Sequence, residues 1–214
     1  MDIIVDKKDL RIEHLELSSY ATNSYIIICP QTGNSALIDV PPGARTIVKH
    51  LKGTKLQYVL LTHNHIDHIG GLRAFRDRVK APLAVHQADN QRWLPFPPEI
   101  LLNDGDVIQA GKVRIEAIYT PGHTPGSMCF RIGEYLLGGD TLFPGGPGRT
   151  ISAAAFRQIV KSIAEKLFVL SDTTRVFPGH GPSTILKQEK EEFAVFSSRQ
   201  HDPNLHGDVV WLTS

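Results

Sequence analysis

Hydrophobic and polar positions alternate along several short stretches of the chain, a period that is typical of strands with one buried face. Between them lie segments with the wider apolar spacing of amphipathic helices. The predicted strands are residues 10–17, 24–29, 35–40, 58–61, 83–86, 107–110, 113–119, 127–132, 135–137 and 175–177. The predicted helices are residues 44–51, 72–79, 89–93, 152–170 and 186–199, with Ser152 as the N-cap of the fourth.

Strands are followed by helices in both halves of the chain, which predicts two sheets, each covered by helices on its outer side. The turn at 30–34 joins two of the strands as a hairpin, and Gly133-Glu134 joins two more. We find no internal repeat, no low-complexity segment and no long linker. One domain covering residues 1–214 is therefore expected.

Composition narrows the class of protein. The 214 residues are 41% hydrophobic and 21% charged, which is ordinary for a globular chain. The formal net charge of +1 gives no field to attract nucleic acid or an anionic membrane. The first residues do not show the pattern of a signal peptide, a basic segment followed by a long apolar one. No apolar run approaches the roughly 20 residues of a membrane span. We therefore expect a cytoplasmic protein without nucleic-acid or membrane partners.

Metal-capable side chains are concentrated directly after the predicted strand 58–61, in Thr62-His63-Asn64-His65-Ile66-Asp67-His68. His63 and His65 are two positions apart, so in an extended segment they point the same way and can hold one ion. Asp67 and His68 begin the next helix, where a turn directs them at a second position nearby. Imidazole and carboxylate ligands suit zinc, iron or manganese.

Three further motifs place a single histidine or aspartate after a predicted strand. His123 stands in Thr120-Pro121-Gly122-His123-Thr124-Pro125-Gly126, Asp140 in Gly138-Gly139-Asp140-Thr141, and His180 in Pro178-Gly179-His180-Gly181. The flanking Pro and Gly residues are typical of sharp turns that project a side chain from a strand end. Together with the histidine-rich segment after strand 58–61, these motifs make four strand ends that carry His or Asp. They predict a common rim at which the ligands converge.

With these motifs in hand, the chain resembles the metallo-β-lactamase superfamily from about residue 20 to about residue 190. The resemblance implies an α+β fold, a four-layer αββα sandwich, and two divalent metal ions, zinc foremost, with iron or manganese as alternatives. Position by position, it implies that His63, His65 and His123 hold the first ion, that Asp67, His68 and His180 hold the second, and that Asp140 bridges both.

The resemblance also implies a reaction. Two ions that share a solvent molecule lower its pKa, and the resulting hydroxide attacks a carbonyl carbon. Asp67 and Asp140 are the expected catalytic carboxylates, since Asp140 bridges the ions and Asp67 can orient the hydroxide. Asp39, at the end of Ala36-Leu37-Ile38-Asp39, and Thr62 are expected to support the ligand loop from behind.

The stretch from Gly139 to Thr150 narrows the substrate, because it resembles the corresponding stretch of glyoxalase II (hydroxyacylglutathione hydrolase). The expected activity is thioester hydrolysis on a small-molecule substrate, and Arg149 matches the basic position that contacts glutathione. Two departures are visible: only 34 residues follow His180, and Ile151 replaces an expected aromatic residue. A glutathione thioester is therefore one candidate among thioesters, and whether glutathione is recognised stays open.

Two alternatives remain. A persulfide dioxygenase of the same fold would bind one iron through the residues that match His63, His123 and Asp140. A lactonase or esterase of this fold would keep the whole ligand set and differ only in its substrate. The sequence determines neither the metal nor the oligomeric state.

Overall fold

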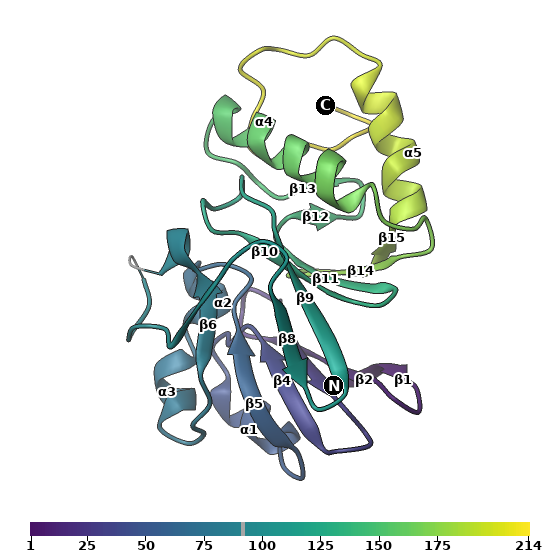
Figure 1. The fold of residues 1–214 in the computed structure, drawn as a ribbon. Coiled ribbons are helices and arrows are strands. Elements are labelled where there is room, and N and C mark those ends of the chain that lie inside the picture. Colours follow the sequence, from purple (N-terminus) through teal and green to yellow (C-terminus); the bar gives the residue numbers. More distant parts are fainter. Residues whose placement is uncertain (91–92) are drawn as a thin grey trace.

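The computed structural model describes residues 1–90 and 93–214. Two β-sheets face each other in the middle of the molecule, and helices cover the outer face of each (Figure 1). The predicted four-layer αββα sandwich is therefore confirmed.

The first sheet contains seven strands in the order of the sequence: β1 (Asp2–Asp6), β2 (Arg11–Leu17), β3 (Thr22–Ile28), β4 (Asn34–Ile38), β5 (Lys55–Leu60), β6 (Leu83–His86) and β7 (Ile100–Leu102). Strands β1 to β4 are antiparallel to one another, and β4 to β7 are parallel. Its outer face is covered by α1 (Ala44–His50) and α3 (Leu72–Arg76), and α2 (Ile66–Ile69) lies between β5 and α3 in the chain.

The second sheet has the strand order β15-β14-β11-β10-β9-β8. Its strands are β8 (Val107–Ala110), β9 (Val113–Tyr119), β10 (Met128–Ile132), β11 (Tyr135–Gly139), β14 (Arg175–Pro178) and β15 (Thr184–Ile185). The outer layer consists of α4 (Ala153–Ser162), the π-helical turn η2 (Ile163–Leu167) and α5 (Leu186–Ser197). A small hairpin of β12 (Leu142–Phe143) and β13 (Gly146–Pro147) follows β11.

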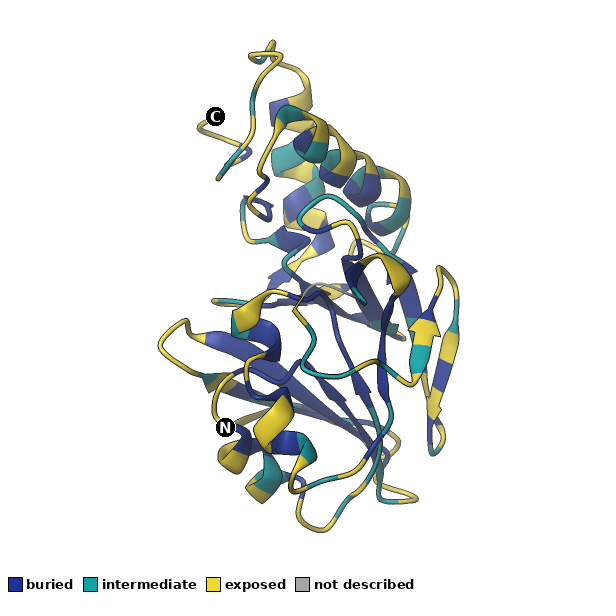
Figure 2. Cartoon of the chain, turned by 90° about the vertical axis from the view of Figure 1, so that its left-hand side faces the viewer, coloured by how far each residue is buried: buried dark blue, intermediate teal, exposed yellow. Residues whose placement is uncertain are grey.

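Three buried clusters fill the three spaces between the four layers, and strand β3 shows how the sequence produces them. Tyr25 and Ile27 point into the cluster between the sheets, while Ile26 and Ile28 point into the cluster under α1 and α3. Because both faces of this strand are covered, all seven of its residues are buried, and its second half is the apolar run Tyr25–Ile28. Figure 2 shows the same pattern, with buried strands inside and exposed residues on the outer helix faces.

Most predicted elements are present, with shifts at their ends. Ser152 is the N-cap of α4, and its hydroxyl accepts a hydrogen bond from the Ala155 amide at 3.2 Å. The predicted helix 152–170 is α-helical only to Ser162 and continues as η2. The predicted helix 89–93 falls partly on residues 91 and 92, outside the described residues, and a 3-10 turn, η1 (Gln87–Asp89), precedes them.

The sequence patterns missed β1, which has five residues, and β7, β12, β13 and β15, which have two or three each. In the described part of the chain, none of the helices has both the length and the apolar character that a membrane crossing would need.

Candidate metal centre

The seven predicted ligands lie on one rim of the sandwich, because each follows the end of a strand. The histidine-rich loop follows β5, His123 follows β9, Asp140 follows β11 and His180 follows β14 (Figure 1). Their side chains form three overlapping groups in which the candidate ligand atoms all lie within 4.8 Å of one another. The groups are His63, His65 and His123; His63, His68 and Asp140; and Asp67, His68 and His180.

The first group consists of three imidazoles. Nδ1 of His65 lies 2.9 Å from Nε2 of His123. The rings of His63 and His65 have centroids 4.8 Å apart, so the two-residue spacing does bring them together. Nitrogens bound to one tetrahedral zinc at 2.0–2.1 Å are about 3.3 Å apart, so the close approach of His65 and His123 fits such a site.

The group of Asp67, His68 and His180 joins two imidazoles and a carboxylate. Nε2 of His180 lies 3.2 Å from Nε2 of His68 and 3.2 Å from Oδ2 of Asp67. Nε2 of His68 and Oδ2 of Asp67 are 3.7 Å apart. These separations also match a shared cation, and the donor set of nitrogens and oxygen suits the same metals.

Asp140 lies between the group of three imidazoles and the group of Asp67, His68 and His180, and the overlapping group of His63, His68 and Asp140 links them. Its Oδ1 is 3.4 Å from Nε2 of His68, and its Oδ2 is 3.4 Å from Nε2 of His123. Among the described residues, neither Asp140 Oδ1 nor Nε2 of His63 has a hydrogen-bond partner, although both atoms are buried. Because a buried polar atom without a partner costs about 1–3 kcal/mol, the two atoms fit a site built around cations.

Gly179 shows how closely the chain packs around this carboxylate. A Cβ added to Gly179 would overlap Oδ1 of Asp140 and approach Cε1 of His68 to 2.7 Å. Only glycine fits there, which explains the Gly-His pair after β14.

Asp39 supports the loop after β5, as the sequence predicted. Its carboxylate accepts hydrogen bonds from the backbone amide of Thr62 at 2.8 Å and from its hydroxyl at 2.7 Å, and contacts Nδ1 of His68 at 2.7 Å. The Thr62 hydroxyl lies 3.0 Å from Nδ1 of His63. Since that hydroxyl donates to Asp39, it can accept from His63, and the Nε2 atoms of His63 and His68 are left facing the site. Asp39 has a φ of 56°, a left-handed conformation that aspartate tolerates better than most residues.

Backbone carbonyls orient two of the three remaining histidines, His123 and His180. Nδ1 of His123 lies 2.8 Å from the carbonyl oxygen of Arg149, and Nδ1 of His180 lies 3.0 Å from that of Tyr20. An Nδ1–H that donates to a carbonyl fixes the tautomer and leaves Nε2 free to bind a metal.

Asp89 is a buried acid that the sequence analysis did not assign to the site. Its Oδ2 accepts from the Thr124 hydroxyl at 2.7 Å and from the Asn64 amide at 3.2 Å, and its Oδ1 accepts from the Gly126 amide at 2.9 Å. Asn64 separates His63 from His65, while Thr124 and Gly126 follow His123. This carboxylate therefore joins the two loops that carry the first group. The sequence offered one indication of this role, which is that Asp89 follows shortly after the buried strand β6.

The electrostatics favour cation binding. Burial, assisted by His68, lowers the pKa of His63 well below its ordinary value, and so keeps its imidazole neutral. Burial opposes ionisation of Asp140, but His68 and the other histidines outweigh it and hold the pKa of this carboxyl below its usual range. Burial alone would lower the pKa of His68, yet Asp140 and Asp39 raise it to about 10. The position between these carboxylates thus stabilises positive charge, which a metal ion also supplies.

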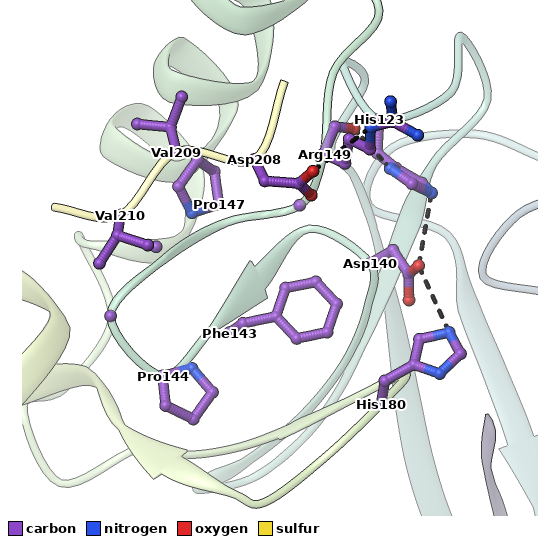
Figure 3. Close-up of a pocket in the computed structure, with 13 residues that line it drawn as sticks. His123, Asp140, Phe143, Pro144, Pro147, Arg149, His180, Asp208, Val209 and Val210 are labelled. Carbon is purple, nitrogen blue, oxygen red and sulfur yellow. Dashed lines mark hydrogen bonds and ion pairs between the residues drawn. The ribbon is translucent and has the colours of Figure 1, made fainter. Parts of the chain in front are cut away.

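A cavity of about 380 Å³ opens on this centre and is lined by His123, Asp140 and His180 (Figure 3). Arg149, the predicted substrate-binding residue, lies at the cavity and outside the three ligand groups. Its Nε is 3.5 Å from Oδ2 of Asp208, and both side chains are largely exposed.

Comparison with known proteins agrees with this geometry. The chain belongs to the metallo-β-lactamase superfamily, whose family model matches residues 19–180. A hydroxyacylglutathione hydrolase of Polaromonas sp. is 35% identical over 168 residues, which cover 76% of this chain and 63% of that protein. YqgX of Bacillus subtilis, named a probable metallo-hydrolase, is 31% identical over 193 residues, 79% of this chain and 90% of that protein.

Solved structures show the same fold. The B3 metallo-beta-lactamase BLEG-1 has a TM-score of 0.76 at 26% identity, covering 84% of this chain and 96% of that one. ETHE1 from Myxococcus xanthus has a TM-score of 0.72 at 29% identity, covering 84% and 81%. TTHA1623, solved in a di-iron-bound form, has a TM-score of 0.68 at 26% identity, covering 83% and 96%. The chain is thus similar to metal-dependent enzymes of this superfamily.

Proposed function

We propose that this protein is a hydrolase that binds two divalent metal ions and cleaves thioesters. The observation that carries the proposal is the meeting of the imidazole groups on Asp140, whose Oδ1 is buried without a hydrogen-bond partner in the described structure. His63, His65 and His123 would hold the first ion, and Asp67, His68 and His180 the second. Zinc suits both donor sets, and iron and manganese are the alternatives; the di-iron form of TTHA1623 supports a pair of ions.

Two divalent ions held side by side activate water at neutral pH and polarise the carbonyl under attack. The chain's own residues then supply orientation. Asp140, between the two groups, fixes their spacing, while Oδ2 of Asp67 lies 3.2 Å from Nε2 of His180 and faces the site. From there it can accept a hydrogen bond from the attacking water and hold its lone pair toward the carbonyl carbon. Of the described residues that line the cavity, none is Ser, Cys or Lys, which supports water as the nucleophile.

The choice of a thioester rests on the glycine-rich stretch from Gly139 to Thr150 and on the named activity of the Polaromonas relative. Arg149 lies at the cavity that this stretch forms, so we place it in contact with the substrate. The chain spans less than two thirds of that relative, so the glutathione part of its activity is not carried over here.

A substrate screen on protein of measured metal content tests the proposal. Thioesters, lactones, simple esters and glutathione persulfide would be compared, with oxygen uptake recorded in parallel. We expect cleavage of thioesters under anaerobic conditions, lost after chelation and restored by zinc. Oxygen uptake with the persulfide and no anaerobic cleavage would instead identify a dioxygenase, and faster turnover of lactones would identify a lactonase.

A further inference from the structure

The C-terminal segment 207–211 lies along the glycine-rich loop 143–149 and closes one side of the cavity. Figure 3 shows Asp208, Val209 and Val210 on the side of the cavity opposite His180. All three line the cavity together with Phe143, Pro147 and Arg149. Residues far apart in the sequence thus line one cavity together with the candidate metal ligands His123, Asp140 and His180.

The segment is fixed at both ends. Thr150 and Gly207 pair as an antiparallel bridge, with N–H to O distances of 3.1 Å and 3.0 Å, and the Trp211 amide donates to the Gly145 carbonyl at 2.8 Å. The Trp211 ring is fully buried and lies 5.1 Å from the ring of Phe196. Residues 208–210 are therefore a short anchored span and not a loose tail.

The glycine-rich loop 143–149, which lies along this segment, is fixed as well. The buried carboxylate of Glu189 on α5 accepts from the Gly145 amide at 3.0 Å and from the Thr184 hydroxyl at 2.6 Å. A Cβ on Gly146 would overlap the carbonyl oxygen of Val209, so the loop and the segment pack without room for a side chain. The cavity between them is therefore preformed, as ligand pockets generally are.

The lining indicates what this cavity accepts. Its inner wall is apolar, formed by Phe143, Pro147 and Val210, and its volume lies near the lower end of the range for ligand pockets. Arg149 alone would attract an anion, but Asp208 pairs with it at 3.5 Å and cancels its charge. The pair is exposed at the cavity mouth, so it sets the local charge and adds little to stability.

We infer that the segment 208–210 is part of the substrate-binding site, and that this site takes an uncharged, apolar group in preference to an anionic thiol such as glutathione. The inference rests on the proposed function, since it assigns the part of a thioester that occupies this cavity. A carboxylate bound beside Arg149 would lie within a few ångströms of Asp208, and removal of that repulsion in water is worth about a threefold change in affinity.

Binding of two thioethers tests the inference without requiring catalysis. S-butylglutathione and S-butyl-N-acetylcysteamine share the alkyl group, differ in charge and cannot be hydrolysed as thioesters. Calorimetry on zinc-loaded protein should show that the neutral thioether binds at least about threefold more tightly. Asp208→Asn should narrow this difference about threefold, and Glu165→Gln, which removes an exposed charge from η2, should leave it unchanged.

A second variant examines the apolar wall. Val210 is 46% exposed and Val169 is 72% exposed, so aspartate at either position should be compatible with folding. Val210→Asp should weaken binding of the neutral thioether at least tenfold, while Val169→Asp should not. Equal or tighter binding of S-butylglutathione, no binding of either thioether, or an inert Val210→Asp would overturn the inference. Thioether binding without thioester cleavage would overturn only the proposed function.

Discussion

Asp89 offers a sharp test of how the first group of ligands is held. In Asp89→Asn one carboxylate oxygen is replaced by an NH2 group, which cannot accept the hydrogen bonds that Oδ2 receives from Thr124 and Asn64 or the one that Oδ1 receives from Gly126. At least one hydrogen bond to a charged acceptor is lost, worth about 1.5–3 kcal/mol. A loss of about 2 kcal/mol lowers the Tm of a chain of this size by about 4–8 °C.

The more specific consequence concerns metal affinity. Because Asp89 joins the loops of His63, His65 and His123, its loss should weaken the first site and leave the second, which depends on Asp39. Changes behind a metal ligand typically cost about 10–100-fold in affinity, so we expect a loss in that range at one site only. Zinc titration against a competing chelator resolves the two binding steps.

Asp106→Asn is the matched control. Asp106 accepts from the Asn103 amide at 2.7 Å in a turn that carries none of the candidate ligands. It should leave both zinc affinities unchanged. If Asp89→Asn lowers the Tm but weakens both sites equally, or neither, Asp89 is a structural residue and does not hold the first group.

Three further outcomes are expected. Asp39→Asn should weaken the second zinc site about 10–100-fold, because Asn tolerates the φ of 56° but its NH2 group cannot accept its part of the three hydrogen bonds from Thr62 and His68. An unaltered second step in the titration would contradict this. His65→Ala should remove one bound zinc per chain by mass spectrometry and abolish thioester cleavage, while circular dichroism shows a folded chain; full activity would remove His65 from the site. Glu99 is held by Arg76 and by the Leu83 amide, which lower its pKa to about 2 from the usual 4.5. Its contribution is therefore present above pH 4.5 and lost as the pH falls towards 2, so Glu99→Gln should cost about 0.5–1 kcal/mol at pH 7 and nothing near pH 2 in denaturant titrations.

The sequence predicted the four layers, and it predicted which His and Asp side chains would lie together on one rim, because both depend on local patterns. The alternating direction of side chains along β3 sends Tyr25 and Ile27 to one layer and Ile26 and Ile28 to the other, and Pro and Gly around His123 and His180 mark the strand ends. The two-residue spacing of His63 and His65 predicts a shared direction in any extended segment.

The residues that the sequence did not reveal act through contacts distant in the chain. Asp89 contacts Gly126, 37 positions away, and Trp211 packs on α5 while its amide binds the loop at Gly145. No periodicity links such pairs. Nor does a motif show which ring nitrogen of a histidine points into the site. His123 points its Nε2 there because its Nδ1 contacts the Arg149 carbonyl, whereas His65 points its Nδ1 toward Nε2 of His123.

Anomalous diffraction from crystals of the zinc-loaded protein is the most direct test of the metal centre. The geometry predicts two peaks per chain, one among His63, His65 and His123 and one among Asp67, His68 and His180, with Asp140 between them. A single peak, or strong peaks bound by other residues, would contradict a pair of ions at this rim.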